Sequence, residues 1–561
     1  MGLCLYVLRW MLVAACVSEG VAGAVSQQEG AALCALLHST RGDSWRWRPE
    51  ILAGAVWNCS VDAAGGLVHN PCSHGGSSWQ GVTCSGTPAE CSSQVCQVTE
   101  LVLPLFNMTG PIPPEIGNLT SLEIFDVGSN SLTGSIPVCV GELTALQVLY
   151  LFNNMLTGPI PVELGQLTAL EILYLYSNML TGHIPVELGQ LTQLEHIYLS
   201  FNKLSGSIPV EMGQLTALER LQFNDNQLTG SIPVEVGQLI ALVRLHLYGN
   251  FLKGYIPLEI GQLKNLQQLY LDSNHLSGSI PSTVGQLTAM KYLNLYDNQL
   301  VGTIPVEVGK LINLRYLVVY SNQLTGHIPV EVGLLTALEL LSLYDNQLSG
   351  SIPVELGHLN VLELFAVRTN QLTGTVPVEV GQLTVLELLY INDNYLTGPI
   401  PAELGQLTFL KVFYLHDNKL TGSIPLELGQ LTALERLAIH NNHLTGPILP
   451  GVVNGLGNVD ELFLYDNELV GPLPIEMTNM RKLKTLFLQD NLLTGTLEGV
   501  FNSSTQIHLT TIDFSDNRLM GSLPVEMFLL SHLQVLSLSG IHKQVFFCNA
   551  VIVQLTMNVS Y

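Results

Sequence analysis

Positively charged residues are scarce in this chain of 561 residues, which has 21 Lys and Arg against 45 Asp and Glu and a net charge of −24. Only 12% of the residues are charged, whereas 47% are hydrophobic. Binding to a nucleic-acid backbone needs a surplus of basic side chains, and disordered or coiled-coil proteins are rich in charge. The composition therefore argues against a nucleic-acid partner and favours a folded protein.

Long apolar runs are also few. Residues 10–17 form such a run after Arg9, and residues 22–24 (Ala-Gly-Ala) have the small side chains that a signal peptidase recognises. We therefore expect residues 1–24 to be a cleaved signal peptide. Neither this run nor residues 545–553 could cross about 30 Å of hydrocarbon, so we expect no membrane span in this chain.

Catalytic and metal-binding motifs are missing as well. The sequence contains no CxxC, HExxH, GxSxG, phosphate-binding loop or kinase signature. We therefore predict that the protein is not an enzyme and has no cofactor and no metal. His416 and His440 lie 24 residues apart, with His443 just beyond. We interpret them as polar surface residues, with a metal or pH-sensing site as the alternative.

Cysteine is concentrated near the N-terminus. Of the ten cysteines, Cys4 and Cys16 fall in the expected signal peptide, and five of the other eight lie between Cys59 and Cys96. This tract is rich in Gly and Ser and builds little core, so disulfides are its natural constraint and the compartment is oxidising and extracellular. Asn-x-Ser/Thr triplets predict glycosylation at Asn58, Asn107, Asn118, Asn502 and Asn558.

From residue 98 the chain repeats with a period of 24 residues. The repeated asparagine stands at 130, 154, 178 and so on to 442, and then at 467, 491 and 517. Seventeen units carry it, and two end units have Phe106 and Ile541 in its place. We predict about nineteen repeats over residues 98–541, with an N-terminal cap over residues 25–97 and an atypical tail over residues 542–561.

Each repeat position has a physical role. The Leu-x-Leu pair alternates between core and solvent, as in a short strand, and strands of successive coils stack into a parallel sheet. The amide of an asparagine such as Asn178 can donate to and accept from backbone groups where the chain turns. Gly182 permits a turn with positive φ, and Pro185 fixes φ near −65° in the return segment.

These positions resemble the plant-type leucine-rich repeat, LxxLxLxxNxLxGxIPxxLxxLxx, over about four-fifths of the chain. Residues 42–45 and 79–84 resemble the N-terminal cap of that family, which includes ectodomains of receptor-like kinases, receptor-like proteins and polygalacturonase-inhibiting proteins. The resemblance implies an α/β leucine-rich-repeat solenoid, a curved right-handed superhelix. Its parallel β-sheet would form the concave face, 3-10 or irregular turns the convex side, and disulfides would staple the cap.

The resemblance also implies a disulfide between Cys72 and Cys84. This chain departs from the family pattern by adding Cys91 and Cys96, for which pairing with each other is one option. The connectivity of the other cysteines is left open.

Outward strand positions form one continuous surface in a solenoid, because neighbouring strands lie about 4.8 Å apart. Tyrosine is concentrated there. Ring packing explains part of this pattern, and exposed rings also suit a peptide- or glycan-binding surface. Arg220 and Arg244 stand in one column and would together bind a carboxylate. The alternative is that Glu219, Asp225 and water compensate their positive charges. The predicted ligand-binding residues of the concave face are Tyr150, Phe152, Tyr174, Tyr176, Tyr198, Arg220, Arg244, His246, Tyr248, Tyr270, Tyr296, Tyr320 and Tyr344.

Acidic residues also form columns. Glu stands fifteen residues before the repeated Asn, or before Ile541 in its place, in fourteen repeats. In a second column, Asp directly precedes the repeated Asn at Asp225, Asp297, Asp345, Asp393, Asp417, Asp466, Asp490 and Asp516. We interpret both acidic columns as a source of solubility, with a cationic partner or Ca²⁺ as the alternative.

The signal, the cap and the tyrosine columns together predict a secreted, non-enzymatic recognition protein. Its ligand would be a peptide, a glycan or another protein, bound in a receptor-like or inhibitor-like way, with a co-receptor as a further partner. The alternatives are a structural or adhesive protein of the wall or matrix, favoured by the near-identical repeats, and a truncated ectodomain of a receptor-like kinase, which the apolar tail suggests.

Overall fold

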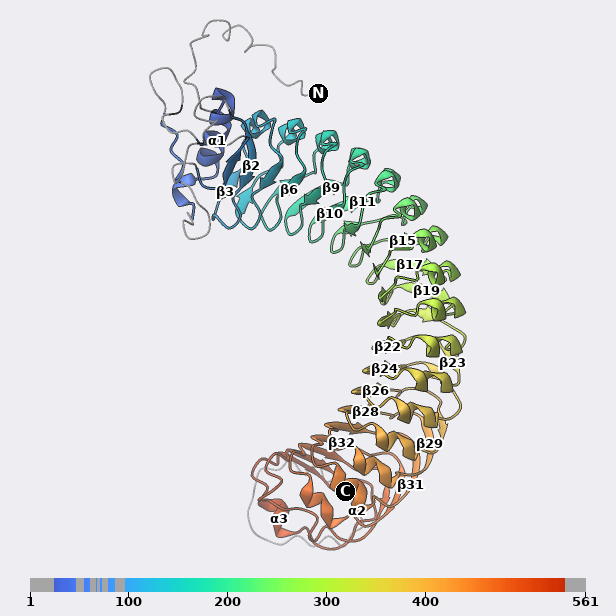
Figure 1. The fold of residues 1–561 in the computed structure, drawn as a ribbon. Coiled ribbons are helices and arrows are strands. Elements are labelled where there is room, and N and C mark those ends of the chain that lie inside the picture. The colour runs from blue at the N-terminus through green and yellow to red at the C-terminus, as the bar shows by residue number, and fades with distance from the viewer. Residues whose placement is uncertain are drawn as a thin grey trace, which may run out of the picture. The chain divides into compact units, whose positions relative to one another are not determined.

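The computed structural model describes residues 25–46, 55–60, 67, 71–72, 79–85 and 96–539. It divides the chain into two compact units, Met1–Gln227 and Leu228–Tyr561, which are built from the same kind of coil (Figure 1). The expected signal peptide, most of the expected tail, Cys91 and Asn558 lie outside the described residues.

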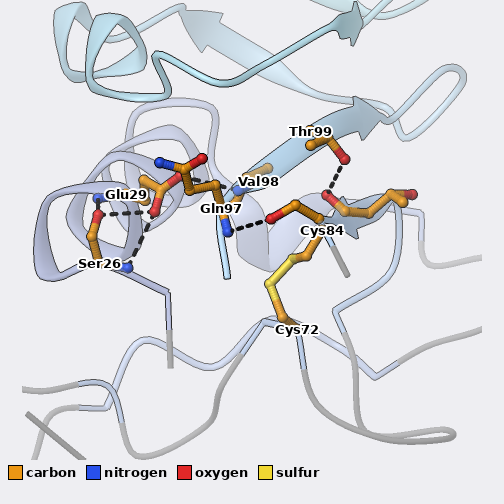
Figure 2. The surroundings of a disulfide bond; sticks show 9 residues. Ser26, Glu29, Cys72, Cys84, Gln97, Val98 and Thr99 are labelled. Carbon is orange, nitrogen blue, oxygen red and sulfur yellow. Dashed lines mark hydrogen bonds between the residues drawn. A yellow bond between two sulfur atoms is a disulfide. The ribbon is translucent and has the colours of Figure 1, made fainter. Parts of the chain in front are cut away.

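The first unit opens with helix α1 (Gln27–Ser39), which begins at a capping box. The Glu29 amide donates to Ser26 Oγ at 3.2 Å, and the Ser26 amide donates to Glu29 Oε2 at 3.1 Å. The other carboxylate oxygen of Glu29 accepts from the Val98 amide at 3.0 Å (Figure 2). A single buried carboxylate therefore starts the helix and joins it to the first repeat.

Two disulfides staple this region, Cys34 to Cys59 and Cys72 to Cys84. The second is the pair that the family resemblance implied, and it anchors strand β1 (Val82–Cys84) beside β2 (Val98–Val102) (Figure 2). Cys96 is also disulfide-bonded.

The core between these disulfides is aromatic. The ring centroids of Trp45 and Trp57 lie 5.1 Å apart and those of Trp57 and Trp79 lie 5.0 Å apart. Trp57 Nε1 donates to the Gln80 carbonyl at 2.9 Å, so the polar edge of this buried ring is satisfied.

The main sheet of the first unit contains one short strand from each coil. Strand β1 pairs with β2 in the antiparallel sense, and the later strands pair in parallel. Alternation buries the leucines, and Leu173 and Leu175 have no exposed surface. Full burial of a leucine contributes about 1.5–3 kcal/mol. After β1 and β2 the strands are β4 (Ile124–Asp126), β6 (Val148–Tyr150), β8 (Ile172–Tyr174), β10 (His196–Tyr198) and β12 (Arg220–Gln222).

The second unit repeats this sheet in parallel pairs, with the same register from one coil to the next. Its strands are β14 (Arg244–His246), β16 (Gln268–Tyr270), β18 (Tyr292–Asn294), β20 (Tyr316–Val318), β22 (Leu340–Ser342), β24 (Leu364–Ala366), β26 (Leu388–Tyr390), β28 (Val412–Tyr414), β30 (Arg436–Ala438), β32 (Glu461–Phe463), β34 (Thr485–Phe487), β36 (Thr511–Asp513) and β37 (Val535–Ser537).

The repeated asparagines link neighbouring coils, as predicted. Asn178 Nδ2 donates to the carbonyl of Leu151 in the preceding coil at 2.9 Å and to that of Leu175 in its own coil at 3.1 Å. Its Oδ1 accepts from the Leu156 amide at 3.0 Å. The side chain thus pairs three buried backbone groups at the point where the strand ends.

The predicted turn chemistry is also present. Gly182 has a φ of 79°, and Pro185, with a φ of −63°, caps the following 3-10 helix. A second glycine has a different role, because a Cβ on Gly189 would lie 2.6 Å from the carbonyl oxygen of Glu211 in the next coil. Successive 3-10 turns therefore pack backbone to backbone at this position.

Two-residue to five-residue strands follow Phe106 and the repeated asparagines up to Asn491, and they form short ladders beside the main sheet. They are β3 (Thr109–Pro111), β5 (Ser131–Thr133), β7 (Thr157–Gly158), β9 (Met179–His183) and β11 (Lys203–Gly206) before β13 (Gln227–Leu228), and then β15 (Lys253–Gly254), β17 (His275–Gly278), β19 (Gln299–Gly302), β21 (Gln323–Leu324), β23 (Ser349–Gly350), β25 (Gln371–Leu372), β27 (Thr397–Gly398), β29 (Lys419–Ser423), β31 (His443–Gly446), β33 (Glu468–Gly471) and β35 (Leu492–Leu493).

Short helices close the coils on the other side. None of the described helices has both the length and the apolar character needed to cross a bilayer. The 3-10 helices are η1 (Gly42–Ser44), η3 (Pro114–Asn118), η4 (Val138–Glu142), η5 (Val162–Gln166), η6 (Val186–Gln190) and η7 (Val210–Gln214) in the first unit, and η8 (Val234–Gln238), η9 (Leu258–Gln262), η10 (Ser282–Gln286), η11 (Val306–Lys310), η12 (Val330–Leu334), η13 (Val354–His358), η14 (Val378–Gln382), η15 (Ala402–Gln406), η16 (Leu426–Gln430) and η17 (Ile475–Asn479) in the second, which adds α2 (Pro450–Gly455) and α3 (Val525–Phe528).

Candidate ligand-binding face

The outward positions of the main-sheet strands and of the residues that lead to the repeated Asn are here called the strand face. Parallel pairing without a shift places equivalent residues of successive coils side by side. Tyr150 is the register partner of Tyr174, and Tyr174 is that of Tyr198. The columns predicted from the sequence therefore exist as surfaces within each unit.

The first unit carries an aromatic patch of Tyr150, Phe152, Tyr174, Tyr176 and Tyr198, named here the first patch. Its rings stack in two neighbouring columns. Centroids are 4.8 Å apart for Tyr150 and Tyr174, 4.3 Å for Tyr174 and Tyr198, and 4.8 Å for Phe152 and Tyr176. The two columns also touch, because the centroids of Tyr174 and Tyr176 are 6.1 Å apart. The patch is therefore two rings wide.

Polar groups at the edge of the first patch are bonded to it. The Tyr174 hydroxyl and His196 Nδ1 form a hydrogen bond of 3.1 Å. Burial, and then the neighbouring Tyr198, raise the pKa of Tyr174, which keeps this hydroxyl protonated. The pKa of the Arg220 guanidinium is also raised, chiefly by its hydrogen bond to Tyr198. Much of the hydrogen-bonding capacity of this patch is therefore used within the protein.

Phe201 is an exposed ring in the same coil as Tyr198 and is missing from the predicted set. It stands directly before a repeated Asn, has a left-handed φ of 54° and exposes 53% of its surface. Bulky side chains rarely adopt this conformation, and strain of this kind concentrates at functional sites. The signal was present in the sequence, because the equivalent positions are mostly Asp, Ser or Asn.

The second unit begins its aromatic surface at His246, Tyr248 and Tyr270. The rings of His246 and Tyr270 stack with centroids 4.4 Å apart, and Tyr248 is tilted against Tyr270 at 6.4 Å. His246 Nε2 lies 3.0 Å from Gln268 Oε1. Burial, with a smaller contribution from the Arg244 charge, lowers the pKa of His246 to about 4, so the imidazole is neutral at neutral pH.

Further along the second unit lies a single column of rings, Tyr296, Tyr320 and Tyr344, named here the tyrosine ladder. Neighbouring centroids are 4.5 and 4.2 Å apart. The Arg368 guanidinium continues the column, 4.4 Å from the centroid of Tyr344 and 5.5 Å from that of Tyr390. Burial, and then the Asp272 carboxylate, raise the pKa of Tyr296 to about 12. The ladder therefore ends at a stacked cation.

The neighbouring column beside the ladder contains no ring. Asn294, Val318 and Ser342 stand beside the three tyrosines and Ala366 stands beside Arg368, as register partners on β18, β20, β22 and β24. Val318, Ser342 and Ala366 expose 8%, 4% and 3% of their surfaces. The tyrosine ladder is consequently one ring wide, unlike the first patch.

Arg368 was also missing from the predicted set. None of the ion pairs among the described residues includes it, whereas Arg315 pairs with Glu339 and Arg436 with Glu461. A sequence signal existed, because Arg368 is the one Lys or Arg that stands two positions before a repeated Asn.

The predicted pair of Arg220 and Arg244 is divided between the two units. Each arginine lies on a strand of its own unit, β12 and β14, and the anion site between them stays a prediction. The thirteen predicted ligand-binding residues lie on the strand face of their own units, and their role in binding stays a prediction.

The aspartate column has a conformational cause in addition to its charge. All eight aspartates have left-handed φ angles between 51° and 54°. Asp and Asn tolerate this conformation better than most residues because their short side chains bond locally. The turn into the repeated Asn therefore selects them, whatever they contribute to solubility.

His416, Asp417 and His440 are the described residues whose donor atoms could hold a metal ion, since one such atom from each lies within 4.8 Å of the others. Our interpretation of these histidines as surface residues is wrong for His440, which is only 7% exposed.

Four predicted glycosylation sites, Asn58, Asn107, Asn118 and Asn502, are exposed. Their modification stays a prediction.

The comparisons with known proteins agree with this architecture. A model described as "Leucine-rich repeat region" matches residues 91–208 and 331–539, and one described as "Leucine Rich Repeat" matches residues 265–287 and 289–311. A search of curated proteins finds no match.

Several solved structures are similar. The plant peptide hormone receptor RGFR1, in complex with RGF2, is 35% identical, with a TM-score of 0.75 and coverage of 82% of this chain and 79% of that one. PEPR1, in the PEPR1-AtPEP1 structure, is 30% identical, with a TM-score of 0.77 and coverage of 92% and 72%. The Arabidopsis receptor kinase HAESA, in complex with the peptide hormone IDA and the co-receptor SERK1, is 31% identical, with a TM-score of 0.72 and coverage of 83% and 80%.

Proteins of this ectodomain type are extracellular and typically non-enzymatic, and the disulfides of the cap fit an oxidising compartment. The repeat, its asparagine ladder and these similarities lead to one conclusion: the chain belongs to the leucine-rich repeat proteins of the plant type, and it resembles the ectodomains of plant receptor kinases over most of its length.

Proposed function

We propose that this chain is a secreted, non-enzymatic recognition protein that binds an extended peptide along the tyrosine ladder of its second unit. The observation that carries the proposal is the stack of Tyr296, Tyr320 and Tyr344 ending at Arg368, a cation without a carboxylate partner among the described residues. Structures of RGFR1 with RGF2 and of HAESA with IDA support a peptide as the ligand class.

The spacing of the ladder suits an extended chain. Its rings recur every 4.2 to 4.5 Å, and an extended peptide rises about 3.3 Å per residue, so several residues could lie across three rings. Tyrosine provides a large apolar area and a hydroxyl at low cost in conformational entropy, which is why it is common at binding hot spots. A main-chain carbonyl of the peptide would accept a hydrogen bond from a hydroxyl of the ladder.

Arg368 gives the ladder a direction. Its guanidinium can bind a carboxylate with two parallel hydrogen bonds while its face stays stacked on Tyr344. The peptide would therefore place an acidic side chain or its C-terminal carboxylate at this end. A co-receptor belongs to the same proposal, since the HAESA complex contains SERK1.

A displayed library of random peptides, panned against the secreted full chain, tests the proposal. We expect the enriched peptides to share an acidic group and to lose binding to Arg368→Ala. Arg436→Ala is the matched control, because Arg436 lies on the same unit but is paired with Glu461 at 3.3 Å. Enriched peptides that bind both variants equally, or no enrichment at all, would contradict the proposal.

A structural or adhesive role is the second candidate, and one observation favours it. The first residue of successive 3-10 helices is an exposed valine, at 49% for Val162, 49% for Val186 and 51% for Val210. A regular apolar row of this kind suits lateral association rather than recognition of a single ligand. Concentration-dependent assembly that Val186→Lys abolishes, together with a failed peptide screen, would favour this role.

A further inference from the structure

His416 and His440 lie side by side on the second unit, on successive coils. Strands β28 and β30 pair with Tyr414 opposite Ala438, so the two histidines that follow fall in one column. Their rings stack with centroids 4.3 Å apart and an interplanar angle of 8°. The repeat therefore brings two imidazoles together that are 24 residues apart in the sequence.

Asp417 adds a carboxylate to the pair. Its left-handed φ of 52° turns the side chain toward both rings. Oδ2 lies 2.7 Å from His416 Nδ1 and 3.9 Å from His440 Nε2. Asn441 Nδ2 donates to the other oxygen at 2.7 Å, which orients the carboxylate as outer-shell groups do in metal sites.

His440 is the buried member of the cluster. It is only 7% exposed, and its Nδ1 has no hydrogen-bond partner among the described residues. The ring of Tyr465 stacks on it with centroids 4.1 Å apart. The nitrogen without a partner is Nδ1, and the other nitrogen, Nε2, is the one that lies 3.9 Å from Asp417 Oδ2. The buried ring therefore brings an imidazole nitrogen next to the carboxylate at the same place as His416.

We propose that His416, Asp417 and His440 bind a divalent transition-metal ion of the zinc class. Two imidazole nitrogens and one carboxylate oxygen, with water in the remaining position, form a donor set that Zn²⁺ commonly takes. Calcium does not fit, because it needs six to eight oxygen ligands. The site is separate from the tyrosine ladder and does not depend on the peptide proposal.

Binding would change the spacing of the cluster. One donor atom of each residue lies within 4.8 Å of the others, and His416 Nδ1 and Asp417 Oδ2 are 2.7 Å apart, whereas the ligands of a tetrahedral zinc ion are about 3.3 Å apart. An imidazole binds a metal in its own plane, so at least one ring must rotate out of the stack. Metal binding should therefore replace the contacts between His416 and His440 with coordination.

Titration of Zn²⁺ into the metal-free full chain by calorimetry tests the site. We expect one ion per chain, with affinity reduced at least tenfold in His416→Gln and in His440→Gln. His443→Gln is the matched control and should bind like the wild type, because His443 lies outside the cluster and is paired with Glu468 at 3.8 Å. Absence of binding to the wild type, or equal affinity in all three variants, would overturn the proposal.

A second measurement uses the wild type alone and so does not depend on the folding of a variant. Crystals of the full chain grown with Zn²⁺ are measured at the zinc absorption edge. An anomalous peak between His416, Asp417 and His440 supports the site. No peak there, or a peak only at other positions, overturns it.

Discussion

In the first unit the rings of the strand face fill two neighbouring columns, whereas in the second unit the tyrosine ladder fills only one. Tyr174 is next to Tyr176 in its own coil, but Tyr320 has Val318 beside it. The backbone is the same in both places. The difference is made by one outward position of the strand, which is Tyr in three coils of the first unit and Asn, Val and Ser in the three coils of the ladder.

The two surfaces also differ in their polar groups. In the first patch, His196 and Arg220 are bonded to Tyr174 and Tyr198. At the ladder, Arg368 is stacked but has no ion pair among the described residues. The tyrosines of the ladder are also bonded within the protein, Tyr296 to Asp272 and Tyr320 to Tyr344. The two surfaces therefore differ in the charge of Arg368, which the ladder keeps for a partner. Tyrosine content alone does not identify a binding surface; the state of the neighbouring polar groups does.

The largest expected effect comes from removing the ladder. A triple substitution to Ser at Tyr296, Tyr320 and Tyr344 should weaken binding of the selected peptide by more than about 1000-fold. The reason is that hot-spot tyrosines contribute about 2 kcal/mol or more each. The same change of Tyr174, Tyr176 and Tyr198 should leave the affinity within about threefold. Calorimetry measures both, with circular dichroism to confirm folding. Equal losses would end the distinction between the two surfaces.

Acid should destabilise the second unit. The pKa values of His246 and His440 are about 4 in the folded chain and 6.5 in the unfolded chain, so unfolding takes up protons below pH 6.5. The stability that these neutral histidines provide is complete above pH 6.5 and is lost as the pH falls to about 4, at up to about 3 kcal/mol each.

Hydrogen exchange of the second unit at pH 7 and pH 4.5, with a chelator present, measures this loss. His246→Gln should reduce the pH dependence around β14 and β16. An unchanged profile in that variant would show that burial of this ring does not control the transition.

Two substitutions of Arg368 distinguish the contribution of its charge to peptide binding from the contribution of its planar shape. Arg368→Ala should weaken the peptide by about 10-fold to 100-fold, the range of a charge-assisted hydrogen bond. Arg368→Lys keeps the charge but loses the planar fork and the stacking, so we expect it to recover less than half of the lost free energy. Peptide affinity measured at two salt concentrations distinguishes the contribution of the charge from that of the planar fork and its stacking. Full recovery by Lys would mean that charge alone directs the ligand.

The smallest effects concern the left-handed turns. Phe201→Asn in the first unit and Thr369→Asn in the second, where φ is 54° and 55°, should each raise stability by about 0.5–1 kcal/mol. Chemical denaturation measures both. A loss of stability in either variant would mean that the native side chain makes contacts that outweigh its backbone strain.

Much of the fold was predictable because the spacing of residues within each repeat determines its strand and turns. The spacing of Asn178, Gly182 and Pro185 predicted the ladder of amides, the positive φ and the return segment, and each is present. The family resemblance supplied the pairing of Cys72 with Cys84. The candidate site was predicted only as a list of outward residues, since periodicity tells which side of the strand a residue occupies but not what it touches.

The sequence by itself determined the solenoid, its columns and the side of the sheet on which each column lies, because these follow from a period of 24 residues and an alternation of two. Only the tertiary structure decided which column members act together. The left-handed turn at Asp417, the stacking of Arg368 on Tyr344 and the burial of His440 depend on side-chain torsions and on neighbours one coil away. Such contacts are set by packing between coils, which no single repeat encodes.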